Sequence, residues 1–83
     1  MENIVYTIPY CPYCVMAKQL LERAGVAYEE RLLKTPDEID EIKNMYNWRT
    51  MPVIILNGRF VGGFDEADAL VRGGKLEEVL DRK

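Results

Sequence analysis

Residues 3–25 decide the fold of this chain, and they read NIVYTIPYCPYCVMAKQLLERAG. A short run of β-branched and aromatic side chains comes first, and Pro9 closes it, which predicts a buried strand. Proline is favoured at the first position of a helix, so Pro12 predicts a helix that begins directly after Cys11. Apolar side chains then recur at helical spacing as far as Gly25, which is typical of a helix end. The stretch therefore predicts a strand followed by a helix that opens at a cysteine.

The rest of the chain adds strands and helices in a definite order. Residues 26–33 alternate apolar and charged side chains, which predicts a second strand at a sheet edge, and residues 35–38 match a capping box that opens a second helix. Residues 52–61 read as a hairpin around an Asn-Gly turn. A last helix is expected with Asp65 as its N-cap, followed by another turn or two at residues 76–80. The order β-α-β-α-β-β-α begins with a parallel strand–helix–strand unit and predicts an α/β fold with a mixed sheet.

Length and composition limit what the chain can be. It has 83 residues with no repeat or linker, so residues 1–83 are expected to form a single domain. Its 11 basic and 14 acidic residues give a net charge of −3 without a basic run, which disfavours nucleic acid and anionic membranes as partners. The longest apolar run is too short to span a bilayer, and the start resembles no signal peptide. The expected location is the cytoplasm.

The absence of histidine excludes several kinds of active site. Ser-His-Asp triads, Cys-His pairs and histidine-containing zinc sites all need an imidazole. The cytoplasm keeps thiols reduced, so the only two cysteines, Cys11 and Cys14, are unsuited to a structural disulfide there. They are better interpreted as redox-active or metal-binding. A zinc site would need a dimer or ligands from outside the chain. The two cysteines could also be small buried residues whose spacing has no function.

The position of the cysteines favours redox chemistry. Residues at i and i+3 are neighbours on a helix, close enough to form a disulfide. A helix N-terminus can lower a cysteine pKa from about 8.5 to roughly 3.5–7.5, which forms a thiolate without a general base. Cys11, just before the helix, is therefore predicted to be the nucleophile. Cys14, inside the first turn, is predicted to be more buried and to resolve the mixed disulfide.

Three separated motifs, residues 11–14, 50–53 and 62–66, resemble those of the dithiol glutaredoxins, and the resemblance covers nearly the whole chain. It implies a minimal thioredoxin fold, with a four-stranded mixed sheet flanked by helices. It also implies a monomeric enzyme that uses glutathione, without a permanently bound cofactor or metal, to reduce protein disulfides and glutathione mixed disulfides. Its partners would be glutathione and disulfide-containing or glutathionylated proteins.

The resemblance also implies a set of glutathione-binding residues. Pro52 would have a cis peptide bond, which would leave the Met51 backbone free to pair with glutathione. From the sequence alone, a proline at the start of a strand is better interpreted as trans and structural. Gly63 would allow close approach, and Phe64 and Asp65 would hold the γ-glutamyl end of glutathione. A tight turn followed by an ordinary N-cap explains the same residues without a ligand.

Three further aromatic and cationic positions have two interpretations. The family commonly has a lysine where this chain has Ile8, and Arg49 is the best substitute cation, although an exposed arginine needs no function. Tyr13 is predicted to wall the groove, or it is a surface residue. Trp48 lines the groove or covers the core, and the core is favoured.

The leading hypothesis is a glutathione-dependent thiol–disulfide oxidoreductase, and two alternatives stay open. The chain could be a redoxin that thioredoxin reductase reduces and that donates electrons to an enzyme such as ribonucleotide reductase. It could also carry a glutathione-ligated [2Fe-2S] cluster in a dimer, although Pro12 argues against this because the cluster-binding members usually have a smaller residue there.

Overall fold

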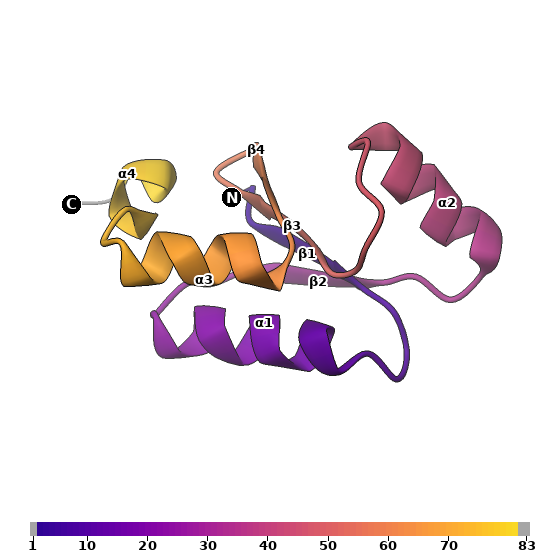
Figure 1. The fold of residues 1–83 in the computed structure, drawn as a ribbon, viewed down its shortest axis with the longest axis horizontal. Helices are drawn as coiled ribbons and strands as arrows, with labels where there is room; N and C mark the ends of the chain where they lie inside the picture. Colours follow the sequence, from indigo (N-terminus) through magenta and orange to yellow (C-terminus); the bar gives the residue numbers. More distant parts are fainter. Residues whose placement is uncertain (1, 82–83) are drawn as a thin grey trace.

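The computed structural model describes residues 2–81 and has a four-stranded sheet between helices (Figure 1). The elements in chain order are β1 (Ile4–Thr7), α1 (Pro12–Arg23), β2 (Glu29–Leu32), α2 (Pro36–Met45), β3 (Val53–Leu56), β4 (Arg59–Gly62), α3 (Phe64–Arg72) and α4 (Leu76–Leu80). This confirms the predicted order and the minimal thioredoxin fold, with the residues at 76–80 forming a short helix of their own. In the part of the chain that the structure describes, no helix has the length and hydropathy to cross a membrane.

The sheet is mixed, with the strand order β2-β1-β3-β4. Strand β1 pairs in parallel with β2 and antiparallel with β3, and β3 pairs antiparallel with β4. Strand β2 lies at an edge, as its charges predict. It begins at Glu29 rather than at the predicted Val26, because the N–H of Val26 donates to the carbonyl of Leu21 at 2.9 Å and still belongs to the turn that ends α1.

Each face of the sheet has its own core. Helices α1 and α3 lie side by side against one face, and α2 covers the other (Figure 1). Successive side chains of a strand point to opposite faces, so Ile54 and Leu56 pack with α1 and α3, whereas Val53 and Ile55 pack on the side of α2. Both α1 and α3 begin at the same end of the molecule (Figure 1), and this end carries the cysteines.

Local sequence explains two helix starts. Cys11 is the N-cap of α1, and Pro12 occupies the first turn as predicted. Thr35 caps α2 in a reciprocal arrangement, in which its Oγ1 accepts from the N–H of Glu38 at 3.2 Å and its own N–H donates to Glu38 Oε1 at 3.1 Å. Each bond satisfies an N–H group that the helix leaves without a partner.

Helix α3 corrects one prediction. Its N-cap is Gly63, not Asp65, which is the second residue of the helix. The chain turns earlier than expected because Gly62 has a φ of 126°, and the N–H of Gly63 then donates to Glu66 Oε1 at 2.9 Å. The carboxylate of Asp65 is therefore not needed as the cap.

Candidate active site

The two cysteines differ in their surroundings. Both are free thiols; Cys11 is partly exposed, whereas Cys14 is only 2% exposed. Cys11 precedes the helix and its side chain lies beside the first turn, where the N–H of Cys14 donates to its Sγ at 3.2 Å. The sulfur thus occupies the place that a serine or aspartate oxygen usually takes at an N-cap. An anion at this place is stabilised by the helix dipole as well as by the hydrogen bond.

Burial keeps Cys14 protonated. Its removal from water raises the pKa of the Cys14 thiol to about 12, and the hydrogen bond with the Cys11 side chain acts in the same direction. A backbone hydrogen bond from Ile8 and the charge of Lys18 oppose this rise in pKa without cancelling it. The chain therefore has one accessible sulfur at a helix start and one buried, protonated sulfur next to it.

The Met51–Pro52 segment lies against the accessible sulfur. The Met51–Pro52 peptide bond is cis, as the resemblance implied and the sequence alone did not. The Sγ of Cys11 lies 4.0 Å from the carbonyl oxygen of Met51, although the two residues are 40 positions apart in the sequence. Pro52 is fully buried below them. The backbone of Met51 thus borders the sulfur.

A shallow groove of about 290 Å³ leads from Met51 to the start of α3. We call it the α3 groove, and its lining residues are Tyr13, Trp48, Thr50, Met51, Gly63, Phe64, Asp65 and Glu66. The ring of Tyr13 faces that of Phe64 with their centroids 6.3 Å apart, so the first turns of α1 and α3 form one wall. The N–H groups of Phe64 and Asp65 are in the first turn of α3, where no helical carbonyl can accept their hydrogen bonds. This end of the groove suits a carboxylate.

Known proteins match this chain over most of its length. The family model for glutaredoxin matches residues 3–61. The chain belongs to the glutaredoxin family. A glutaredoxin from Pseudomonas aeruginosa is 40% identical over 78 residues, which are 93% of each chain. The solution structure of a glutaredoxin from Brucella melitensis is 37% identical with a TM-score of 0.81, covering 96% of this chain and 88% of that one.

A third relative is a complex with glutathione. This is the crystal structure of a buckwheat glutaredoxin–glutathione complex, 28% identical with a TM-score of 0.84 over 95% of this chain and 76% of that one. Membership in the glutaredoxin family, together with this fold and the Cys11–Cys14 pair, identifies the chain as a thiol–disulfide oxidoreductase.

The structure brings most of the predicted site residues together. Five of them line the α3 groove: Tyr13, Met51, Gly63, Phe64 and Asp65. Arg49 does not line this groove; it borders a neighbouring hollow with Asn47, Trp48 and Thr50. Ile8, which stands where the family often has lysine, packs against the core on the α2 side. Among residues 2–81, no group of three or more acidic, cysteine or histidine side chains is placed to hold a metal ion.

Two residues that line the α3 groove were not predicted from the sequence, and a third had two possible interpretations. Thr50 and Glu66 lie within the quoted motifs, but neither was given a role; the spacing of three between Gly63 and Glu66, a typical capping distance, was the available signal. Trp48 agrees with both interpretations, because it packs against the core on the α2 side and also lines the α3 groove. Its buried Nε1 has no hydrogen-bond partner within residues 2–81.

Proposed function

We propose that the protein is a glutathione-disulfide oxidoreductase that reduces protein disulfides and glutathione mixed disulfides. The observation that carries this proposal is the partly exposed Cys11 sulfur at the start of α1, directly beside the α3 groove. The groove ends at a second helix start, so it offers backbone N–H groups at one end and the sulfur near the other.

Glutathione fits the groove by chemistry. The Met51 backbone is free to pair with the cysteine residue of the tripeptide. The N–H groups of Phe64 and Asp65 would hold the γ-glutamyl carboxylate, and the Asp65 carboxylate would pair with the ammonium group. Tyr13 would cover the tripeptide from the side of α1. Arg49 would receive the glycine carboxylate from the neighbouring hollow, in place of the lysine that Ile8 replaces.

The reaction needs one thiol for a glutathionylated substrate. The Cys11 thiolate attacks the glutathione sulfur, the protein sulfur leaves and takes up a proton, and a disulfide joins Cys11 to glutathione. A second glutathione thiolate then attacks the bound glutathione sulfur, which yields glutathione disulfide and restores the Cys11 thiolate.

A protein disulfide needs both thiols. The Cys11 thiolate first attacks one sulfur of the substrate disulfide, so that the substrate S–S bond breaks, the other substrate sulfur leaves and takes up a proton, and a mixed disulfide joins Cys11 to the substrate. Cys14 then attacks the Cys11 sulfur, its proton passes to the departing substrate sulfur, and a Cys11–Cys14 disulfide remains. Two glutathione molecules reduce this disulfide and become glutathione disulfide. We place the protein in the cytoplasm as a monomer, where glutathione is the abundant reductant.

The test is turnover of a small glutathione mixed disulfide, with glutathione and glutathione reductase, followed by NADPH consumption. We expect Cys11→Ser to lose all activity. Cys14→Ser should retain this activity and lose only the reduction of protein disulfides. Activity that survives Cys11→Ser, or equal losses in the two variants, would contradict the assigned roles.

Two further experiments test which reductant the protein uses and whether Arg49 binds glutathione. If NADPH with thioredoxin reductase restores the oxidised protein and glutathione does not, the redoxin alternative is correct. Arg49→Gln should raise the KM for glutathione about two- to five-fold, as expected for an exposed ion pair. The matched control is Arg59→Gln on β4, which removes the same charge from an exposed position that lines neither the α3 groove nor the hollow beside Arg49.

A further inference from the structure

A second and larger hollow adjoins the same cysteines. We call it the β2 hollow; it measures about 540 Å³ and its lining residues are Thr7, Ile8, Pro9, Tyr10, Cys11, Pro12, Cys14, Val15, Lys18, Glu30 and Leu32. These residues come from the end of β1, the β1–α1 loop, the first turns of α1 and the edge strand β2. None of them lines the α3 groove. Cys11 lines the β2 hollow, and Met51, whose carbonyl oxygen is 4.0 Å from the Cys11 sulfur, lines the α3 groove, so the sulfur lies between the two hollows.

The rim of the β2 hollow carries exposed apolar side chains. Tyr10 is fully exposed, and Val15 and Leu32 are 48% and 46% exposed. Large apolar groups are common singly on protein surfaces, but several around one hollow are typical of a binding site. Here they line the same hollow as Cys11.

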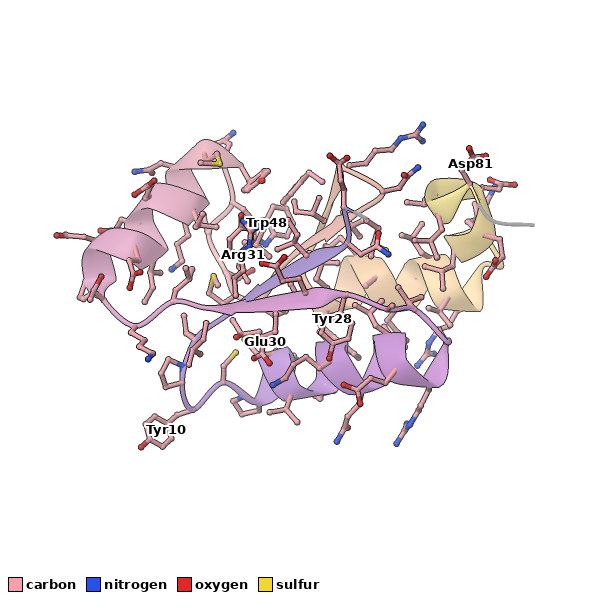
Figure 2. The ribbon with its side chains drawn as sticks, turned by 180° about the vertical axis from the view of Figure 1, so that it is seen from behind. Tyr10, Tyr28, Glu30, Arg31, Trp48 and Asp81 are labelled. Carbon is pink, nitrogen blue, oxygen red and sulfur yellow. The ribbon has the colours of Figure 1, made fainter. Side chains whose placement is uncertain are left out.

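Tyr10 has an unusual backbone conformation. Its φ is 58°, in the left-handed region that bulky residues rarely adopt. This conformation directs the ring away from the molecule at the tip of the β1–α1 loop (Figure 2). Residues in such conformations cluster at functional sites. The phenol is thereby presented immediately before the nucleophile.

The charges of the β2 hollow neutralise each other. Lys18 Nζ lies 3.0 Å from Glu30 Oε2, and the Thr7 hydroxyl donates to the same oxygen at 2.8 Å. Glu30 extends from β2 toward α1 (Figure 2), so the pair spans the hollow between strand and helix. Lys18 and Glu30 are the only acidic or basic side chains among its lining residues. Glutathione carries two carboxylates and an ammonium group, and it would find no unpaired charge here. The hollow suits an uncharged, apolar group.

We propose that the β2 hollow binds the polypeptide beside the reacting cysteine of a protein substrate, with an apolar residue next to that cysteine seated among Tyr10, Val15 and Leu32. This inference rests on the proposed function. In the reduction of a protein disulfide, the substrate sulfur becomes bonded to Cys11. In the attack on a glutathionylated peptide, the substrate sulfur is the leaving group, bonded to the glutathione sulfur that Cys11 attacks. In both reactions, the residues on either side of the substrate cysteine are brought to the edge of the hollow. The reaction thus brings the substrate polypeptide to the β2 hollow, while glutathione is held in the α3 groove.

The experiment compares two capped pentapeptides, each with a central cysteine in a mixed disulfide with glutathione. One has leucine on both sides of the cysteine and the other has serine. Enzymatic kcat/KM is divided by the uncatalysed rate with glutathione, which removes differences in intrinsic reactivity. We expect the wild type to prefer the leucine peptide about ten-fold, the factor for partly burying one leucine-sized side chain.

Variants of the lining residues test whether the β2 hollow causes the preference for the leucine peptide. Tyr10→Asn keeps a residue that tolerates the left-handed conformation, and Leu32→Thr keeps a strand-forming residue. Each should reduce the preference at least three-fold and leave turnover of a small glutathione mixed disulfide unchanged. Met45→Gln, which replaces an exposed apolar residue on α2, should alter neither.

Two results would overturn the inference. One is equal turnover of the two peptides by the wild type. The other is a loss in the variants that extends to the small disulfide, since this would show damage to the common site. Failure of the proposed function itself is recognised separately, because the wild type would then not turn over the small disulfide with glutathione.

Discussion

The thiol of Cys14 is expected to stay protonated at neutral pH even when Cys11 is replaced by serine. With a pKa of about 12, only about one molecule in 10⁵ carries a Cys14 thiolate at pH 7, whereas a free cysteine with a pKa near 8.5 is about 3% ionised. The substitution removes the neighbouring sulfur, but burial, the largest cause of the high pKa, remains. We therefore expect the thiolate fraction to be at least about 100-fold below that of a free cysteine.

The measurement is alkylation of Cys11→Ser by iodoacetamide between pH 6 and 10.5. The rate at pH 7 should be at least about 100-fold below that of a cysteine peptide, and it should rise about ten-fold per pH unit with no plateau below pH 10. The same variant in denaturant should react like the peptide, which shows that the fold causes the difference.

The pH at which the alkylation rate reaches a plateau shows whether the low rate comes from a raised pKa or from poor access of the reagent. Poor access alone would lower all rates by one factor and leave a plateau near pH 8.5. A plateau below pH 9, or a rate near that of the peptide, would refute the assignment of Cys14 as the protonated thiol.

Three further predictions concern other parts of the fold. Asp65→Asn should raise the KM for glutathione about three-fold, as for a surface ion pair, in the assay with the small mixed disulfide. Gly62→Ala should lower the unfolding free energy by about 1–3 kcal/mol in urea, because alanine is strained at φ 126° and its Cβ would lie 2.8 Å from Glu66 Cγ. Burial and the hydrogen bond from its hydroxyl to Glu22 Oε2, 2.6 Å long, raise the pKa of Tyr28, and a raised pKa gives stability that is lost as the pH rises. Urea midpoints should therefore fall above pH 10, and less so in Tyr28→Phe.

The parts of the fold that depend on nearby residues were predictable from the sequence. Pro12 and the capping box at Thr35 each mark a helix start through bonds within four residues. The Asn57-Gly58 turn has φ values of 53° and 74°, as an Asn-Gly hairpin requires. The start of β2 was predicted wrongly for two reasons: the turn that ends α1 extends to Val26, and the Asn3 side chain, 24 residues away, then donates to the carbonyl of Ala27.

The site shows the same division. The pairing of Cys11 with Cys14 is local, and its spacing alone indicated the chemistry. The approach of Met51 to Cys11 depends on β1 and β3 pairing antiparallel, which no short pattern encodes, so the resemblance was needed to bring them together. The left-handed conformation of Tyr10 and the β2 hollow were not found from the sequence, because both result from how the β1–α1 loop passes the edge strand.

The N-cap geometry also explains why the chain can do without histidine. In an N-cap, the side chain of the first residue accepts the N–H of the residue three positions later, and this is the spacing of Cys11 and Cys14. Cys14 therefore has two roles: its N–H donates to the sulfur of Cys11, and its side chain carries the second thiol, which is buried inside the turn. A sulfur anion accepts this hydrogen bond and the helix dipole more favourably than a disulfide sulfur does. The structure shows this N-cap bond with both cysteines as free thiols, which is the form that starts the proposed reaction.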